Sequence, residues 1–131
     1  MGWDIRGKTV VVTGATNGIG RAGAVELARR GARLVLVGRD RRRTAEAADA
    51  VRAAGGAAET VVADLSLMEE TRRAAAEVLE LAPRLDVLVN NAGALMPERR
   101  LSAEGHEATL ALNHLSYFLF TNLLLERLKA S

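Results

Sequence analysis

Residues 9 to 20 read TVVVTGATNGIG, and this stretch decides the fold. The β-branched run Thr9 to Thr13 favours a strand, and the Ala-, Leu- and Arg-rich residues that follow the stretch favour a helix. Gly14 permits a sharp turn out of the strand, Gly18 lets the backbone approach a pyrophosphate, and Gly20 lets the helix pack closely on the sheet. A strand, a glycine-rich turn and a helix in this order predict a dinucleotide-binding site, with the phosphates at the helix N-terminus.

The dipeptide Asn17-Gly18 has a second interpretation, because Asn-Gly is a strong signal for a tight β-hairpin turn. A hairpin requires an alternating strand after Gly18, whereas Arg21 to Arg30 is rich in helix-forming residues. The flanking residues therefore favour the dinucleotide interpretation. Thr16, Asn17 and Ile19 lie between the glycines and join them as predicted cofactor-binding residues.

Three further hydrophobic runs predict three further strands: Arg33 to Val37, Thr60 to Ala63 and Asp86 to Asn90. Segments of helical length separate the runs, and strands that alternate with helices form a parallel sheet. The runs are hydrophobic almost throughout, which is typical of strands covered on both faces. We therefore predict an α/β fold, a Rossmann-type parallel sheet with helices on both faces, in one domain over residues 1–131. By analogy with doubly wound folds we expect the strand order 3-2-1-4.

Four helices are predicted between and after these strands. Their expected limits are Gly20 to Arg30, Arg41 to Ala54, Leu67 to Ala82, and about Glu104 to about Lys129. Ser66 and Glu69 have the spacing of a capping box at the start of the third helix, and Pro83 marks its end. Gly31 and the pair Gly55-Gly56 stand where the first two helices should end in residues that tolerate positive φ.

The composition excludes several classes of function. With 49% apolar and 26% charged residues, the 131-residue chain fits one soluble globular domain. Cysteine is absent, and the two histidines, His106 and His114, do not have the spacing of structural zinc ligands, so we expect no metal. The net charge is +2, and the basic run Arg39 to Arg43 has no accompanying aromatic residues or recognition motif. We therefore expect no nucleic-acid partner.

The longest apolar stretch, Leu115 to Leu125, is interrupted by polar residues and is shorter than the roughly 20 residues of a membrane-spanning helix. We interpret it as a buried helix and expect no membrane span. Residues 1–7 lack the pattern of a secretion signal, so we expect a cytoplasmic protein.

The glycines of the turn are spaced Gly-x-x-x-Gly-x-Gly, and in this respect the sequence resembles the short-chain dehydrogenase/reductase family. Further motifs follow in the order of that family. Asp64-Leu65 resembles its adenine-contacting acid, Asn90-Asn91-Ala92-Gly93 resembles its strand-four motif, and Asn113 resembles the helix asparagine of its catalytic set. The segment Leu112 to Leu125 further resembles the retinol-dehydrogenase-like branch.

The resemblance implies roles for these residues. Cofactor contacts are implied for Asp64, Leu65, Asn91, Ala92 and Gly93. In the family the asparagine corresponding to Asn113 holds a water in a proton relay and interrupts the regular hydrogen bonding of its helix.

The identity of the dinucleotide depends on the residue at the end of the second strand. Enzymes selective for NAD carry an acid there, roughly 20 residues beyond the glycine turn, which accepts hydrogen bonds from the ribose hydroxyls. That position is Gly38, and Arg39 follows it with a guanidinium that is able to pair with a 2′-phosphate. NADP is therefore favoured over NAD.

Alternatives stay open at this position. Arg39 is also interpretable as an ordinary surface arginine, and Asp40 becomes the ribose acid if the register shifts by two residues. Some NADP-binding relatives have a basic residue just before the second glycine, where this chain has Asn17. In that case Arg42 or Arg43 is the alternative ligand of the phosphate.

The resemblance also implies the chemistry. Family members move a hydride between the nicotinamide and an alcohol or carbonyl substrate, while a tyrosine passes the proton and a lysine four residues later lowers the pKa of that tyrosine. The one tyrosine here is Tyr117, and Thr121 stands four residues after it, so no Tyr-x-x-x-Lys pair occurs. We expect Tyr117 to be a core or interface aromatic residue.

We therefore expect an NADP-dependent oxidoreductase of this family that is represented by its first half, with the C-terminal half of the fold absent, and that is inactive alone. The full-length form would act on a small-molecule alcohol or carbonyl. The alternative is a non-catalytic dinucleotide-binding or interaction module. An uncovered edge at Asp86 to Asn90 and a wide apolar surface on the last helix further predict self-association to a homo-oligomer.

Overall fold

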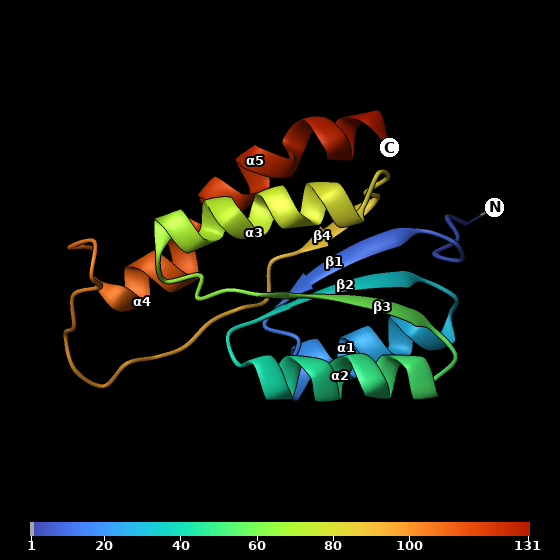
Figure 1. Ribbon diagram of the computed structural model, residues 1–131, viewed down its shortest axis with the longest axis horizontal. Helices are drawn as coiled ribbons and strands as arrows, with labels where there is room; N and C mark the ends of the chain where they lie inside the picture. Colours follow the sequence, from blue (N-terminus) through green and yellow to red (C-terminus); the bar gives the residue numbers. More distant parts are fainter. Residues whose placement is uncertain (1) are drawn as a thin grey trace.

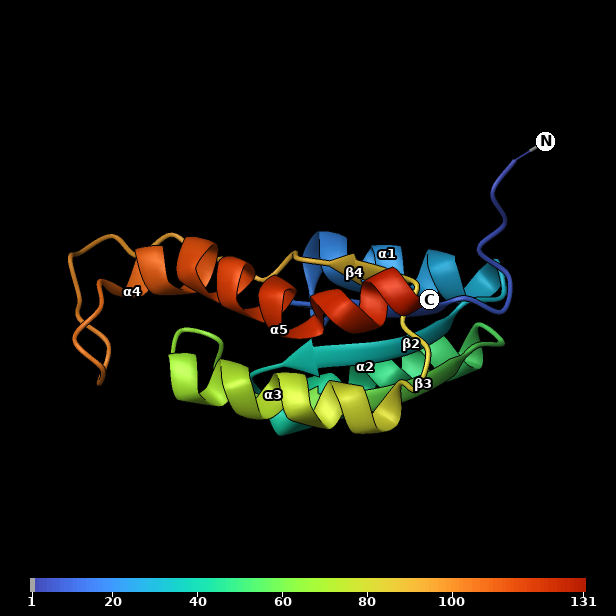
Figure 2. The same ribbon diagram turned by 90° about the horizontal axis from the view of Figure 1, so that it is seen from above.

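The structure, a computed structural model, describes residues 2–131 and consists of a parallel sheet between two layers of helices (Figure 1). The strands are β1 Thr9–Thr13, β2 Arg33–Gly38, β3 Ala57–Val62 and β4 Val87–Val89, in the order β3-β2-β1-β4. The helices are α1 Gly18–Arg29, α2 Arg41–Ala53, α3 Met68–Leu81, α4 Ala108–Leu110, the π-helical turn η1 Ala111–Leu115, and α5 Ser116–Ala130. Helices α1 and α2 cover one face of the sheet, and α3 and α5 cover the other (Figures 1 and 2). The predicted α/β fold and its strand order are confirmed.

Alternate residues of each strand pack on opposite faces of the sheet. In the register of the sheet, Val11 stands between Val35 of β2 and Leu88 of β4. These three side chains belong to the core beneath α3 and α5, where Phe120 and Leu124 are fully buried. The strand residues that point the other way pack against α1 and α2; they include Val10, Val12, Leu34 and Leu36. Both faces are therefore buried, which accounts for the continuous hydrophobic runs.

The limits of most elements agree with the predicted ones within a few residues. Gly31 and Gly55 follow α1 and α2 with φ of 90° and 92°, so both helices end in the positive-φ residues that the sequence predicted. β3 begins three residues earlier than predicted, at Ala57, because it pairs with β2 along the whole of that strand.

The predicted capping box at the start of α3 is wrong. The Ser66 hydroxyl donates to Oδ1 of Asp64 at 2.6 Å, and helix α3 starts two residues later at Met68. The carboxylate of Glu104, which is distant in the sequence, accepts the N–H groups of Met68 at 2.5 Å and Glu69 at 3.1 Å. The Ser66 hydroxyl is therefore engaged with Asp64, and the carboxylate of Glu104 caps helix α3 instead.

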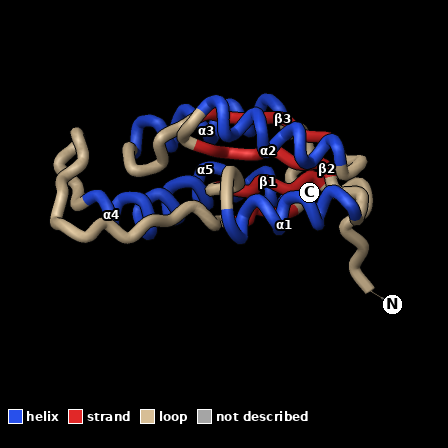
Figure 3. Tube along the Cα trace, turned by 90° about the horizontal axis from the view of Figure 1, so that it is seen from below, coloured by secondary structure: helices blue, strands red, loops and turns tan. Residues whose placement is uncertain are grey.

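The last helix begins at Ala108 and not near Glu104 as predicted. Gly105 has a φ of 85° and lies in a turn that is closed by a bridge between Leu101 and Glu107. The Glu107 side chain then accepts the N–H of Leu110 at 2.7 Å and caps the helix. Asn113 lies within the π-helical turn η1, where the regular hydrogen bonding of the helix is interrupted, as expected for this residue. Figure 3 shows the long loop between β4 and α4 reaching beyond the end of the sheet.

Helix Ala108–Ala130 has 23 residues and, among residues 2–131, is the one helix long and apolar enough to cross a membrane. The helix extends well beyond the apolar run Leu115 to Leu125 on which the expectation of no membrane span was based. A core helix of a soluble protein has the same length and composition, and Phe120 and Leu124 of this helix are buried in the core. The absence of a membrane span stays a prediction.

Within the described residues, β4 pairs on one side only, with β1, so its outer edge is uncovered as expected. The exposed apolar surface of α5 is narrower than expected. Phe118 of α5 is 67% exposed and Leu110 of α4 is 49% exposed, whereas the other leucines of the expected surface are only partly exposed: Leu112 and Leu115 of η1, and Leu119, Leu123 and Leu125 of α5. Self-association stays a prediction, with a smaller apolar surface to support it.

The starts of β1 and β4 are joined through Asp86, whose side chain is only 5% exposed. Its carboxylate accepts the N–H of Thr9 at 2.9 Å and the Nε–H of Arg84 at 2.9 Å, and it lies 3.6 Å from Nζ of Lys8. Arg84, and to a lesser degree the Thr9 N–H, hold the pKa of the Asp86 carboxyl below its ordinary value. A carboxyl with a lowered pKa in the folded state stabilises the fold above its unfolded pKa of about 3.9, and this stability is lost as the pH falls through the folded value.

We predict that Asp86→Asn lowers the free energy of unfolding by about 1–2 kcal/mol at pH 7, because the charge-assisted hydrogen bonds are lost. The difference between parent and variant should shrink as the pH is lowered below about 4. Urea unfolding across this pH range measures both effects. Asp49→Asn, which removes an exposed partner of Arg52, is the matched control and should change little. A difference for Asp86→Asn that does not depend on pH would contradict the assignment.

Candidate dinucleotide-binding site

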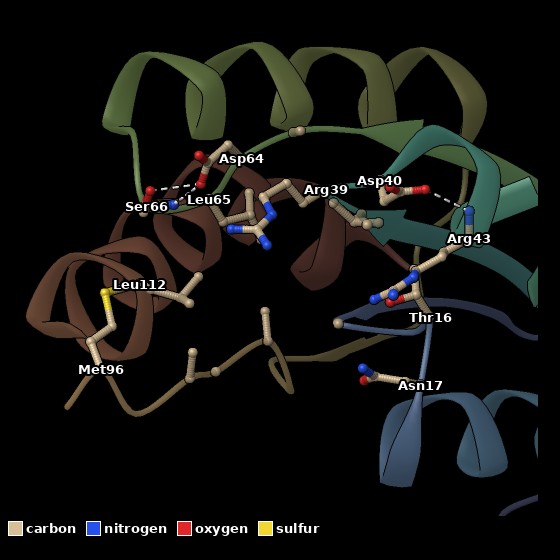
Figure 4. Close-up of a pocket in the computed structure, with 17 residues that line it drawn as sticks. Thr16, Asn17, Arg39, Asp40, Arg43, Asp64, Leu65, Ser66, Met96 and Leu112 are labelled. Carbon is tan, nitrogen blue, oxygen red and sulfur yellow. Dashed lines mark hydrogen bonds between the residues drawn. The ribbon is translucent and has the colours of Figure 1, made fainter. Parts of the chain in front are cut away.

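A pocket lies where the carboxyl ends of the four strands meet, at the reversal of strand order between β1 and β4. Each strand end contributes residues, which Figure 4 shows as sticks. The pocket is lined by Gly14, Thr16, Asn17, Val37, Gly38, Arg39, Asp40, Arg43, Ala63, Asp64, Leu65, Ser66, Ala92, Gly93, Ala94, Met96 and Leu112. The predicted residues from four separate motifs are thus brought to one place.

Some of the predicted residues do not line the pocket: Gly18, Ile19, Gly20, Asn91 and Asn113. Ile19 is 86% exposed on the first turn of α1. Gly18 is exposed next to the lining residue Asn17, whereas Gly20, Asn91 and Asn113 contact lining residues.

The glycine turn follows β1 with two residues in the positive-φ region, Gly14 at 65° and Gly18 at 53°. A Cβ on Gly14 would lie 2.7 Å from Cα of Ala92, so the turn closely approaches the segment after β4. A Cβ on Gly20 would lie 2.3 Å from both the Gly14 carbonyl oxygen and Nδ2 of Asn91. Gly20 therefore makes room for the turn after β1 and for Asn91 after β4, the close contacts that this helix position makes.

Thr13 connects the glycine turn to the segment after β4, and sequence reasoning missed it. Its Oγ1 is buried and accepts the N–H groups of Asn91 and Ala92, both at 3.0 Å. Nδ2 of Asn91 in turn donates to the Gly14 carbonyl at 3.1 Å. The sequence signal that could have indicated this role of Thr13 is a hydroxyl residue at the carboxyl end of an otherwise apolar strand.

The end of β2 has no space for an acidic side chain at the predicted ribose position. A Cβ on Gly38 would lie 2.3 Å from Oγ1 of Thr44 and 2.6 Å from Cγ2 of Thr16. Asp40 is also engaged, because its Oδ1 accepts the N–H of Arg43 at 2.8 Å and caps α2, and this hydrogen bond lowers the pKa of the Asp40 carboxyl. The guanidinium groups among the residues lining the pocket are those of Arg39 and Arg43 (Figure 4).

Asp64 and Leu65 form the wall that follows β3. Oδ1 of Asp64 accepts both the N–H of Ser66 at 3.0 Å and its hydroxyl at 2.6 Å, which fixes the turn into α3. Leu65 is 5% exposed and its buried side chain lines the pocket. Sequence reasoning had placed Ser66 in the capping box and missed its place in this wall.

Asn113 reaches the pocket through the backbone of Ala94. Its Oδ1 accepts the N–H of Ala94 at 3.0 Å, and its Nδ2 donates to the carbonyl of Ala94 at 2.9 Å. Both ends of the amide group are engaged, so in this structure the Asn113 side chain holds the pocket wall.

Comparison with known proteins agrees with this geometry. The family model described as short chain dehydrogenase matches residues 8–131. Retinol dehydrogenase 14 from Mus musculus is 45% identical over an alignment of 139 positions, which covers 97% of this chain and 42% of that protein. Two solved structures are similar: a metagenomic short-chain oxidoreductase in complex with NADP, with a TM-score of 0.85 and 34% identity, and the NADH-dependent reductase A1-R' complexed with NAD, with a TM-score of 0.83 and 33% identity.

The matches cover 98% and 97% of this chain and 59% and 54% of those two structures. The chain therefore spans about half the length of the relatives that it matches. The resemblance inferred from the glycine spacing, the strand-four motif and the last helix is confirmed. The chain belongs to the short chain dehydrogenase family and is similar to its retinol dehydrogenases.

Proposed function

We propose that the pocket binds a nicotinamide dinucleotide and that the chain is the cofactor-binding part of an oxidoreductase acting on an alcohol or carbonyl substrate. The N-terminus of α1 carries this proposal. Its N-cap residue, Asn17, makes no side-chain capping hydrogen bond, and no acidic residue occupies the first turn. The first N–H groups of the helix and its partial positive charge are therefore left for a pyrophosphate.

The space in front of this helix end fits the same ligand. No atom lies within 4 Å of the position that a Cβ on Gly18 would take, whereas Gly14 and Gly20 are tightly enclosed. The turn is thus packed on the side of Asn91 and open at Gly18, as the approach of a phosphate to the backbone requires.

For the choice of dinucleotide we propose NADP over NAD. The crowding at Gly38 leaves no room for a carboxylate that would accept hydrogen bonds from the ribose, and Asp40 is committed to capping α2. Arg39 and Arg43 line the pocket at this end and supply two guanidinium groups for a 2′-phosphate. One of the two similar structures holds NADP and the other holds NAD. The proposed preference for NADP therefore rests on Gly38, Arg39, Asp40 and Arg43.

The bound dinucleotide supplies the hydride chemistry. In this proposal the N-terminus of α1 binds the phosphates of the dinucleotide, and the crowding at Gly38 leaves no room for an acid that would bind the ribose. Asn113 holds the pocket wall at Ala94. Residues 1–131 contain no Tyr-x-x-x-Lys pair to pass a proton. We therefore propose that these 131 residues alone bind the cofactor without turnover.

The open glycine of the turn gives a test of phosphate binding. Gly18→Ala should raise the Kd for both NADPH and NADH about tenfold or more, because the new Cβ occupies the side from which the phosphate approaches. It should also lower the free energy of unfolding by about 1–2 kcal/mol, since φ is positive at this residue. Fluorescence titration of the reduced cofactors and urea unfolding measure the two effects.

Gly23→Ala is the matched control for Gly18→Ala. Gly23 lies in the same helix, also has no atom within 4 Å of the position that a Cβ would take, and has no positive φ. It should keep the parent Kd and gain about 0.5–1 kcal/mol of stability. If Gly18→Ala bound both cofactors as the parent does, the phosphates would not lie at this turn.

The two arginines of the pocket give a test of the NADP preference. Arg39→Ala and Arg43→Ala should each raise the Kd for NADPH about tenfold and leave the Kd for NADH within about twofold, because each loses a charge-assisted hydrogen bond to the 2′-phosphate. Arg42→Ala is the control on the same turn, since Arg42 is 87% exposed and pairs with Glu46 outside the pocket. Equal affinity of the parent for the two cofactors would disprove the NADP preference and leave dinucleotide binding itself standing.

A further inference from the structure

Three polar side chains on successive turns of the last helix hydrogen-bond the chain that follows β4. We call Asn113, Tyr117 and Thr121 the polar row, and residues 90–94 the post-β4 segment. The pairs are Asn113 with Ala94, Tyr117 with Ala92, and Thr121 with Asn90. Each step of four residues along the helix corresponds to a step of two residues back along the segment.

The two spacings match for a geometric reason. Four residues of an α-helix advance about 6 Å, and two residues of extended chain advance about 6.4–6.8 Å. A helix lying antiparallel to an extended segment therefore presents every fourth side chain to every second residue. The first pair falls within the π-helical turn Ala111–Leu115, a kind of irregularity that is frequent at functional sites.

The hydrogen bond of Tyr117 is the central one of the three. Its hydroxyl donates to the Ala92 carbonyl at 2.6 Å, and the side chain is half-buried. A tyrosine hydroxyl keeps its proton at neutral pH and is a hydrogen-bond donor, and burial raises the pKa of Tyr117 further. The expectation that Tyr117 is an ordinary core or interface aromatic residue is thus incomplete, because its hydroxyl has a specific partner in the pocket wall.

The third pair lies at the other end of the segment. Nδ2 of Asn90 donates to Oγ1 of Thr121 at 2.9 Å, directly after the last residue of β4. Thr121 stands four residues after Tyr117, one turn further along the same helix, and so continues the row toward the end of β4.

The post-β4 segment depends on these contacts because it has left the sheet. β4 pairs with β1 only as far as Val89. Beyond that residue the segment is held from the β1 side by Oγ1 of Thr13, which accepts the N–H groups of Asn91 and Ala92, and from the helix side by the polar row. Its last three residues, 92–94, line the pocket.

We propose that Tyr117 and Thr121 are positioning residues of the dinucleotide pocket. Together with Asn113 they fix the position of the post-β4 segment along the last helix, so that the backbone of the segment forms the pocket wall. This inference rests on the proposed function, since it assigns these residues a role in the affinity for the dinucleotide. A purely structural role would lower the stability of the chain but leave the affinity of the folded protein unchanged.

The test uses the 131-residue chain with Tyr117→Phe and Thr121→Val, which remove the hydroxyls with little change of shape. Thr121→Ser restores the acceptor, and Phe118→Leu alters the exposed neighbour of Tyr117 on the same helix. For each variant the Kd for NADPH is measured by fluorescence titration in the absence of denaturant. Urea unfolding and amide hydrogen exchange followed by NMR are measured on the same samples.

Tyr117→Phe should raise the Kd about fivefold, because the Ala92 carbonyl loses its donor, and Thr121→Val about threefold. Thr121→Ser and Phe118→Leu should stay within about twofold of the parent. Exchange of the Ala94 amide and its neighbours should become faster in Tyr117→Phe than in the parent, while exchange in the sheet stays unchanged, with or without cofactor.

An unchanged Kd in both Tyr117→Phe and Thr121→Val, with a parent that binds, would overturn the inference, whether or not the local exchange became faster. A parent that does not bind any dinucleotide would instead overturn the proposed function, and the local exchange rates would then still decide whether the polar row holds the segment. If Tyr117→Phe failed to fold, the comparison of Thr121→Val with Thr121→Ser would decide.

Discussion

The close contact between the end of β1 and the segment after β4 is the constraint on which the site depends. Oγ1 of Thr13 accepts two successive amide N–H groups from that segment, and Gly14 approaches Cα of Ala92 so closely that no Cβ fits between them. β1 and β4 lie side by side because the strand order reverses here. A hydroxyl and a glycine at this junction therefore join the glycine turn and the strand-four motif into one pocket edge.

The rest of the pocket is arranged around this junction by packing. Gly20 leaves room for Asn91 behind the turn, so the turn is closed on that side and open at Gly18. Thr16 and Thr44 crowd Gly38 at the end of β2, and the positive charge at that end is carried by Arg39 and Arg43. The proposed preference for NADP thus follows from two neighbouring facts, the exclusion of a carboxylate and the presence of guanidinium groups.

The features that depend on local chemistry could be predicted from the sequence. Glycine spacing, continuous apolar runs and the helix-ending Gly31 and Gly55 are readable in short windows. The strand order followed from them together with the family resemblance, and eight of the twelve predicted cofactor-binding residues line the pocket. What could not be predicted depends on partners far apart in the chain. The start of α3 is capped by Glu104 across 36 residues, and the hydroxyl of Tyr117 finds its acceptor 25 residues away. No local pattern distinguishes such a hydroxyl from that of an ordinary core tyrosine.

The central claim is that a nicotinamide dinucleotide binds at the strand ends with its phosphates at the N-terminus of α1. The most direct measurement is a titration of the ¹⁵N-labelled chain with NADPH, followed by the NMR signals of the backbone amides. We expect saturable shifts that are largest in the glycine turn, at Arg39 and in the post-β4 segment. Saturable shifts confined to the opposite end of the sheet, for example around Trp3 and Leu27, or the absence of any shift would contradict it.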